Sequence, residues 1–312
     1  MTVDVIVNRN THRLATSTAL RRTLLAAASR GKARLHETET LRDLERVARE
    51  IAAQSTEGVV LAGGDGSHMA GVSALTRAFG GVLPPVALAP CGTVCTIARN
   101  FGARGTARAW TERVVRAACS GAARIERRMT LRVRDDAGGQ RVGFVFGAGL
   151  VARFFDVYDA APAQGLAAAA GIAARVFAGS FVGSALARHI LEPTRCVVSV
   201  DDVPHAADHW SLLLASVVPD LGLHLRATYR AGQTLDRFHV VASGLPARAL
   251  GPQLPRVIAG RALRGEPHID ALARSLHLSH RGGLGAYVLD GDVFAAGETQ
   301  VDVGPELRLM LP

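Results

Sequence analysis

The stretch "VVLAGGDGSHMAGVSAL", residues 59–75, constrains the fold more than any other segment. A short apolar run rich in β-branched residues, 58–62, predicts a buried strand, and it leads directly into Gly-Gly-Asp-Gly-Ser. The pattern that follows is helical, and we expect the helix to begin at Ser67. A glycine-rich turn between a buried strand and a helix is typical of an open α/β sheet, which binds ligands at the carboxyl ends of its strands.

The same alternation of strands and helices fills the first third of the chain. Further strands are predicted at residues 3–7 and 85–89. Helices are predicted at residues 15–30 and 40–54, the second with Thr40 as its N-cap. The alternation predicts a parallel sheet covered by helices on both faces, which is a three-layer α/β domain. We expect this domain to cover residues 1–124.

The sequence after residue 124 has a different pattern. Short strands separated by glycine-rich turns are predicted within residues 129–149, 196–218 and 284–311, and one Ala-rich helix at about residues 163–191. We expect residues 125–312 to form an antiparallel β-sandwich-like domain. The pattern leaves open that the terminal strands pack back on the first domain.

The composition narrows the classes of partner. The chain has 312 residues, 48% of them apolar, which suffices for one large or two ordinary domains. Its net charge of +9 suits an anionic partner such as nucleotide phosphate or an acidic membrane surface. The arginines are scattered without interleaved aromatic residues, so nucleic acid is not expected as a partner. No segment resembles a membrane span or a signal peptide, and we expect a cytoplasmic protein.

Phosphate binding is the expected role of the glycine-rich turn. Three glycines allow backbone N–H groups to approach an anion closely, and the helix start adds its dipole and the Ser67 hydroxyl; they are Gly63, Gly64 and Gly66. The Asp65 carboxylate would repel a phosphate, so we expect a magnesium ion or a substrate hydroxyl beside it. The alternative is a structural role in which Asp65 caps the helix.

Two more loops are predicted at the same edge of the sheet. The segment "LAPCGTVCTIARNFG", residues 88–102, repeats the strand–turn–helix pattern, with Gly92 in the turn and Thr93 at the helix start. The segment after the first strand, "VNRNTHR", brings three polar side chains to this rim, those of Asn8, Asn10 and Thr11.

Two kinase classes and one cofactor motif are excluded by residue type. The chain has no GxxxxGK[ST] motif, and its only lysine, Lys32, lies outside every glycine-rich loop. P-loop kinases and conventional protein kinases both need a lysine on the phosphates. A GxGxxG dinucleotide fingerprint does not follow the first strand.

Four motifs in this order resemble the diacylglycerol kinase catalytic family, which includes bacterial lipid kinases and sphingosine kinases. They span nearly the whole chain: "IVNRN", "GGDGS", "PCGT" followed by "ARNFG", and "VLDGD". The resemblance implies an N-terminal nucleotide-binding domain and a C-terminal β-sandwich-like domain. It also implies transfer of the γ-phosphate of ATP, with Mg²⁺, to a hydroxyl of diacylglycerol or a related lipid.

The resemblance implies site residues as well. Contacts to the nucleotide fall on Asn8 and the loop after it, on Thr38, on residues 64–67 and on Thr93. The proton acceptor of the family's Asp-Gly-Glu motif falls on Asp290 or Asp292, although "LDGD" alone also fits a type I′ hairpin turn. Asp236 remains where the family carries an Asp-Gly pair, and it is the candidate metal ligand.

Several positions depart from the family pattern. Apolar or altered residues replace family polar residues at Met69, Ala70, Cys95, Thr96 and Val151. These departures keep two alternatives open: a nucleotide-binding regulatory protein of the same fold that has lost catalysis, and an NAD kinase, which shares the GGDG loop. The apolar segment 165–190 either forms part of a lipid-facing entrance with peripheral membrane contact or packs as a helix on the sheet.

Overall fold

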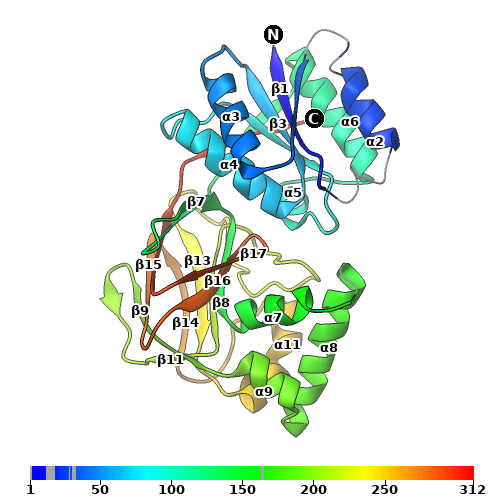
Figure 1. Cartoon of the computed structure of the whole chain (residues 1–312). Helices are drawn as coiled ribbons and strands as arrows, with labels where there is room; N and C mark the ends of the chain where they lie inside the picture. The colour runs from blue at the N-terminus through cyan, green and yellow to red at the C-terminus, as the bar shows by residue number, and fades with distance from the viewer. Residues whose placement is uncertain (1, 12–17, 28, 30–32, 163–164) are drawn as a thin grey trace. The chain divides into compact units, whose positions relative to one another are not determined.

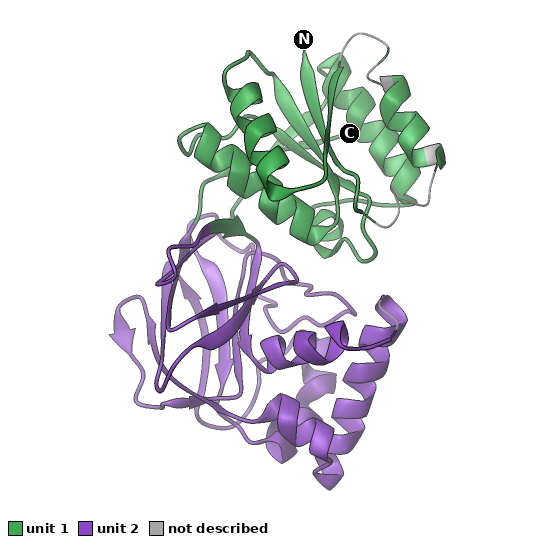
Figure 2. Cartoon of the chain, viewed as in Figure 1, with its two compact units in different colours: residues 1–130, 141–143, 304–312 green, residues 131–140, 144–303 purple. Residues whose placement is uncertain are grey.

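The structure, a computed structural model, describes residues 2–11, 18–27, 29, 33–162 and 165–312. They form two compact units (Figure 2): unit 1 is Met1–Thr130, Arg141–Gly143 and Gly304–Pro312, and unit 2 is Leu131–Gln140 and Phe144–Val303. Unit 1 extends beyond the expected boundary at residue 124 because strand β5 (Arg124–Arg128) pairs with the last strand, β19 (Leu307–Leu311). Since β19 also pairs with β4, the end of the chain belongs to the first sheet.

The sheet of unit 1 has the strand order β2-β1-β3-β4-β19-β5. The first four strands pair in parallel, and they are β1 (Val3–Asn8), β2 (Ala33–Thr38), β3 (Gly58–Gly63) and β4 (Val86–Pro90). The interior strands β3 and β4 are buried along their whole length, as their apolar runs predicted. Strand β2 was not predicted, since it lies at the sheet edge and its polar residues are half-exposed.

Helices cover both faces of this sheet. Figure 1 shows α3 (Leu41–Ala52) and α4 (Asp65–Ala78) on one face, and α2 (Thr18–Ala27) and α6 (Ala107–Ser120) on the other. The predicted three-layer α/β architecture is confirmed. The predicted N-cap is also correct: Thr40 Oγ1 accepts a hydrogen bond from Asp43 N–H at 3.1 Å, and the Asp43 carboxylate accepts one from Thr40 N–H at 3.1 Å.

A buried carboxylate joins β1 to β2. Asp4 is fully buried, and Arg34, its neighbour in register on β2, donates to both of its oxygens at 2.8 and 2.7 Å. His36 Nε2 lies 2.8 Å from Asp4 Oδ1. Burial by itself raises the pKa of Asp4, but hydrogen bonds with His36, Arg34 and Thr56 outweigh it and lower the pKa to about 2.

This pKa predicts an acid limit to the stability of unit 1. A folded-state pKa of about 2 against the ordinary 3.8 corresponds to about 2 kcal/mol in the free energy of unfolding. The contribution is complete above the unfolded-state pKa and is lost as the pH falls from about 4 through about 2. Urea unfolding of wild type and Asp4→Asn across this range measures it, with the exposed Glu50→Gln as control. If the free energy of unfolding fell equally steeply with falling pH in wild type and in Asp4→Asn, the lowered pKa of Asp4 would be contradicted.

Unit 2 contains two antiparallel sheets, which confirms the predicted β-sandwich-like domain. The first has the order β10-β9-β15-β18-β6-β7 and the second the order β14-β13-β12-β8-β16-β17. The strands of the first sheet are β6 (Leu131–Asp135), β7 (Gln140–Gly143), β9 (Thr194–Val200), β10 (Val203–Pro204), β15 (Ser275–His280) and β18 (Glu298–Val303), and β11 (His209–Trp210) pairs with β9. Residues 141–143 of β7 are assigned to unit 1. Those of the second are β8 (Val145–Gly149), β12 (Leu212–Ser216), β13 (Phe238–Ser243), β14 (His268–Ala273), β16 (Gly285–Leu289) and β17 (Asp292–Ala296).

The helices of unit 2 gather on one side of its sheets (Figure 1). They are α7 (Leu150–Asp159), α8 (Leu166–Val182), α9 (Ala185–Leu191), α10 (Ala247–Leu250), the 3₁₀ turn η2 (Gly251–Gln253) and α11 (Leu254–Ile258). One apolar core joins α8 and α9 to β12 and β13, and it includes Ile172, Val176, Ile190, Leu212 and Val241.

The prediction of a single Ala-rich helix is wrong. The chain forms α8 and then α9, bent by 103° at Gly183, which has φ +66° and ends α8. Ser184 begins the next helix, because its hydroxyl accepts a hydrogen bond from Ala187 N–H at 3.2 Å. Within the described ranges, no single helix has the length and apolarity of a membrane span, and only this bent pair meets both criteria together.

Candidate functional site

The carboxyl ends of the four parallel strands bring the predicted loops of unit 1 to one edge of the sheet. Strand β1 ends at Asn8, β2 at Thr38, β3 at Gly63 and β4 at Pro90. Parallel register aligns these ends, with Asn8 beside Thr38 and Gly63 beside Pro90. The glycine-rich turns that follow β3 and β4 are therefore neighbours, as expected for a ligand site in an open α/β sheet.

The two turns touch through glycine backbone. A Cβ added at Gly92 would lie 2.5 Å from the Cα of Gly64 and 3.2 Å from its nitrogen. The N–H groups of Cys91 and Gly92 both donate to Gly63 O, at 2.8 and 3.1 Å. A side chain at Gly92 would force the turns apart. Glycine is therefore required here because the two backbones lie so close together, and not because of the φ angle.

The start of α4 faces this pair of turns. The helix begins at Asp65 and not at the predicted Ser67, and its N-cap is Gly64, which has no side chain to cap the helix. The first backbone N–H groups of an α-helix have no partner within the helix, and they carry the positive end of its dipole. Asn8 Nδ2 donates to Ser67 Oγ at 2.8 Å and so fixes the hydroxyl of the first turn. This arrangement suits an anion such as a phosphate.

Asp65 has a structural role in this site. Its two carboxylate oxygens accept hydrogen bonds from the backbone N–H groups of Thr96, at 2.8 Å, and Ile97, at 3.0 Å. These residues open α5 (Thr96–Asn100), so Asp65 caps the helix of the second loop instead of its own. The geometry favours the structural alternative over a carboxylate directed at a metal or hydroxyl.

We expect Asp65→Ala to lower the free energy of unfolding by about 1–2 kcal/mol, because two N–H groups at the start of α5 lose their acceptor. Urea unfolding measures the loss. The control is Glu50→Ala, which removes an exposed i,i+4 ion pair and should change stability by less than about 0.5 kcal/mol. If Asp65→Ala unfolds like wild type and loses only activity, the carboxylate acts on a ligand after all.

The second loop differs from its prediction at Thr93 and Cys95. Helix α5 begins at Thr96, and Thr93 lies exposed in the turn before it. Cys95 adopts a left-handed conformation, with φ 54°, and Gly92 N–H donates to its Sγ at 3.1 Å. Cys95, which stands where the family carries an asparagine, therefore holds the turn in place. Nothing in the sequence pattern indicated that role.

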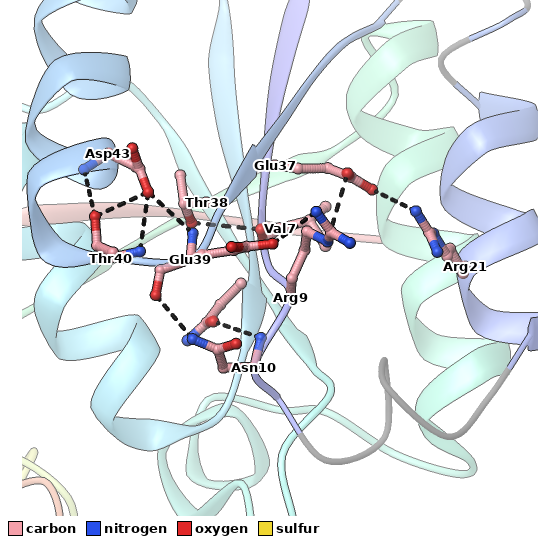
Figure 3. A network of polar contacts seen from close by, with 10 residues as sticks. Val7, Arg9, Asn10, Arg21, Glu37, Thr38, Glu39, Thr40 and Asp43 are labelled. Carbon is pink, nitrogen blue, oxygen red and sulfur yellow. Dashed lines mark hydrogen bonds and ion pairs between the residues drawn. The ribbon is translucent and has the colours of Figure 1, made fainter.

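A polar network joins the ends of β1 and β2 (Figure 3). Asn10 accounts for two of its bonds: its N–H donates to Asn8 Oδ1 at 3.0 Å and its amide group to Glu39 O at 2.8 Å. Thr38 is buried, and its hydroxyl lies 3.4 Å from Val7 O. Thr11 is also buried, and its hydroxyl has no hydrogen-bond partner among the residues described. The structure thus brings the predicted Asn8, Asn10, Thr11 and Thr38 to one rim.

Two residues behind the glycine turn belong to the core of unit 1. Met69 is buried in α4, so this departure from the family pattern faces the interior. His68 is fully buried, with Nε2 3.3 Å from Ala89 O and no partner for Nδ1 within the described ranges. Burial lowers the pKa of His68, against the nearby charge of Asp65, and the imidazole is neutral behind the turn.

In unit 2 the "LDGD" motif is a hairpin turn between β16 and β17. Asp290 and Gly291 have φ of 51° and 99°, as a two-residue type I′ turn requires. The carboxylate of Asp290 accepts hydrogen bonds from Phe144 N–H at 2.9 Å and Val145 N–H at 2.8 Å. Asp290 is therefore buried and engaged in holding the start of β8, which argues for a structural role at this position.

Asp292 is the exposed carboxylate of the same turn. Its side chain reaches solvent, yet protein crowds it on several sides, and this desolvation raises its pKa, helped by the negative charge of Asp159 at the end of α7. A raised pKa makes a carboxylate a better proton acceptor. Sequence reasoning did not identify Asp159, since it lies more than a hundred residues from the motif.

The candidate metal ligand, Asp236, is paired with arginine. Its carboxylate lies 2.6 Å from Arg274 Nη2 and 4.0 Å from Arg237 Nε, and the hydrogen bond from Arg274 is the largest cause of its lowered pKa. Within the described part of the chain, no group of three or more His, Cys, Asp or Glu side chains could hold a metal. Val151 lies in the first turn of α7 and packs against the backbone at Gly147.

Comparison with known proteins agrees with this description. Residues 2–124 match the diacylglycerol kinase catalytic domain. The fold is similar to a diacylglycerol kinase structure from Bacillus anthracis str. Sterne, with 14% identity over 100% of this chain and 97% of that chain and a TM-score of 0.64. It is also similar to yeast NADH kinase, solved in complex with NADH, with 10% identity over 100% of this chain and 84% of that chain and a TM-score of 0.52.

At these identities the two structures establish the fold alone. Comparison with curated proteins gives no match. The matched residues, 2–124, contain every loop of the glycine site. The resemblance seen in the sequence motifs is confirmed, because residues 2–124 match the model of the diacylglycerol kinase catalytic domain.

Proposed function

We propose that the chain is an ATP-dependent lipid kinase that transfers the γ-phosphate of ATP to a hydroxyl of diacylglycerol or a related lipid. The observation that carries the proposal is the contact of Gly64 with Gly92, where two glycine turns at neighbouring strand ends meet in front of a helix start without a side-chain cap. Backbone N–H groups in this arrangement suit the phosphates of a nucleotide. The family of residues 2–124 supports the kinase class.

In this proposal the residues of unit 1 bind the nucleotide. The turns at residues 63–67 and 92–93 cradle the phosphates, and the rim residues contact the rest of the nucleotide; these are Asn8, Asn10, Thr11 and Thr38. Asp65 and Cys95 position the second turn through their hydrogen bonds. Such preorganised donors stabilise the charge of the transferred phosphoryl group.

Asp292 is the proposed proton acceptor. The lipid hydroxyl oxygen forms a bond to the γ-phosphorus, the bond from that phosphorus to the β–γ bridging oxygen breaks, and ADP leaves. The hydroxyl proton passes to the Asp292 carboxylate. Asp292 suits this step better than Asp290, because its side chain is exposed and its pKa is raised.

Magnesium enters the proposal as part of the nucleotide substrate. The side chains do not fit a protein-held ion: Asp65 is engaged by backbone N–H groups and Asp236 by arginines. Magnesium commonly binds the phosphates of the substrate with few protein ligands. We assign it no step of its own.

The alternative of a nucleotide-binding protein without catalysis also has an observation in its favour, since Asp65 and Asp290 are both occupied by structural hydrogen bonds. Incubation with γ-labelled ATP and a panel of lipids separates the two. We expect label in a lipid product that chromatography resolves. Binding of ATP without label in any lipid would favour the regulatory protein.

A further inference from the structure

We propose that the corner between α8 and α9 docks on an anionic lipid bilayer. This inference rests on the proposed function, because a lipid substrate is the reason for the protein to bind a bilayer. All the residues that carry the inference belong to unit 2. Two apolar side chains project at the corner: Phe181 is 57% exposed and Val182 is 76% exposed. Because the two residues are adjacent, they form one exposed apolar surface at the end of α8.

The corner is held rigidly by the helices on both sides. Val182 is the last residue of α8, Gly183 ends the helix in a left-handed conformation, and Ser184 caps α9. Phe177 packs edge-on against Phe181, with ring centroids 5.2 Å apart. The opposite face of α8 is anchored in the core through Ile172 and Val176. Exposure of Phe181 and Val182 is therefore imposed by the fold.

The helices that meet at or near the apolar corner carry exposed positive charge. Arg175, Arg188 and Arg248 are all exposed. Arg248 comes close to the turn itself, because a Cβ at Gly183 would lie 3.2 Å from its guanidinium group. Residues 160–191 contain no Asp or Glu, and among the residues described no carboxylate forms an ion pair with these three arginines. Their charges are available to an external anion.

This combination fits a bilayer surface in particular. Apolar side chains at a convex corner enter the boundary between headgroups and acyl chains, while arginine side chains extend along them and reach lipid phosphates. Most other exposed residues of α8 are small, among them Ala170, Gly171, Ala174 and Ala178, and they allow the helix to lie close to a surface. Leu166, at the start of the helix, is 45% exposed. Each arginine near an anionic membrane contributes about 1 kcal/mol to binding.

Co-sedimentation with vesicles tests the proposal without ATP or catalysis. Wild type should bind phosphatidylglycerol vesicles, bind pure phosphatidylcholine vesicles much more weakly, and lose binding as salt shortens the Debye length from about 8 Å at 0.15 M to about 3 Å at 1 M. The triple variant Arg175→Gln/Arg188→Gln/Arg248→Gln should bind about a hundredfold more weakly. Phe181→Ser/Val182→Ser should bind about tenfold more weakly at any salt concentration.

Two matched controls keep the test specific. Val203→Ser removes an apolar side chain that is 63% exposed elsewhere in unit 2, and Arg108→Gln removes an exposed arginine on α6. Both should bind like wild type. Equal loss in the controls and the corner variants would overturn the proposal, as would wild type that fails to bind anionic vesicles at low salt.

Fluorescence locates the corner directly. The two native tryptophans, Trp110 and Trp210, are buried, so Phe181→Trp adds an exposed reporter. Its emission should shift to shorter wavelength on addition of anionic vesicles, whereas Val203→Trp should not shift. A dimer in solution that Phe181→Ser dissociates would assign the corner to a second copy instead.

Phosphorylation of a short-chain, water-soluble diacylglycerol tests the kinase separately. This activity should persist in the corner variants, and its absence in wild type would leave the result with vesicles unchanged.

Discussion

Alanine at Gly92 is expected to weaken ATP binding by at least about a hundredfold. Its Cβ would lie 2.5 Å from the Cα of Gly64, so the two turns must separate and their N–H groups can no longer converge on one nucleotide. Forcing extra volume into a packed contact also costs about 1–3 kcal/mol of stability. Calorimetric titration with ATP measures the affinity, and urea unfolding measures the stability.

Gly171→Ala is the matched control, since no atom lies within 4 Å of the added Cβ and the residue sits inside α8. Alanine there should leave ATP binding unchanged and should slightly stabilise the helix. Wild-type ATP affinity in Gly92→Ala would show that the paired turns do not form the nucleotide site.

The second large effect is expected for Asp292→Asn, which should lower kcat by about 10²–10⁴ while ATP affinity and unfolding stay as in wild type. An amide cannot accept the hydroxyl proton, and the exposed position of Asp292 limits its effect on folding. Because the base must be deprotonated, the wild-type rate should rise with pH through the raised pKa of Asp292, and the variant should lack this rise. Steady-state rates from pH 4 to 8 measure both.

Asp290→Asn provides the contrast, because an amide can accept only one of the two hydrogen bonds from Phe144 and Val145. We expect it to unfold at lower urea concentration and to lose activity in proportion to its unfolding. Asp292→Glu keeps the carboxylate and should retain turnover. Full stability together with complete loss of turnover in Asp290→Asn would reverse the roles assigned to the two carboxylates.

Local sequence signals identified three of the strands of unit 1 and the start of one of its helices. The apolar runs of β1, β3 and β4 predicted buried parallel strands, and Thr40 is the N-cap that was expected. The structure adds Asp43, which completes a capping box with Thr40. Glycines at Gly64 and Gly92 were recognised from their place between strand and helix. The need for glycine at the contact between the two turns is seen only in the structure, because the two residues follow different strands.

Contacts between distant segments account for what sequence reasoning missed. Asp65 caps a helix that begins 31 residues later, and Asp290 holds backbone more than 140 residues away, so neither partner follows from a motif. The left-handed Cys95 moved the start of α5 from the predicted Thr93 to Thr96. The break after α8 had a local signal, Gly183 followed by Ser184, but the surrounding alanines favour helix throughout.

The most direct measurement is a single reaction that contains γ-labelled ATP, a dispersion of diacylglycerol and NAD together, followed by extraction into organic solvent. The proposed function predicts that label enters the organic phase as a phosphorylated lipid, that Asp292→Asn reduces it by about 10²–10⁴, and that no label enters a dinucleotide. Label in the aqueous dinucleotide fraction would contradict the proposal in favour of an NAD kinase. Bound ATP with no labelled product would contradict it in favour of a regulatory nucleotide-binding protein.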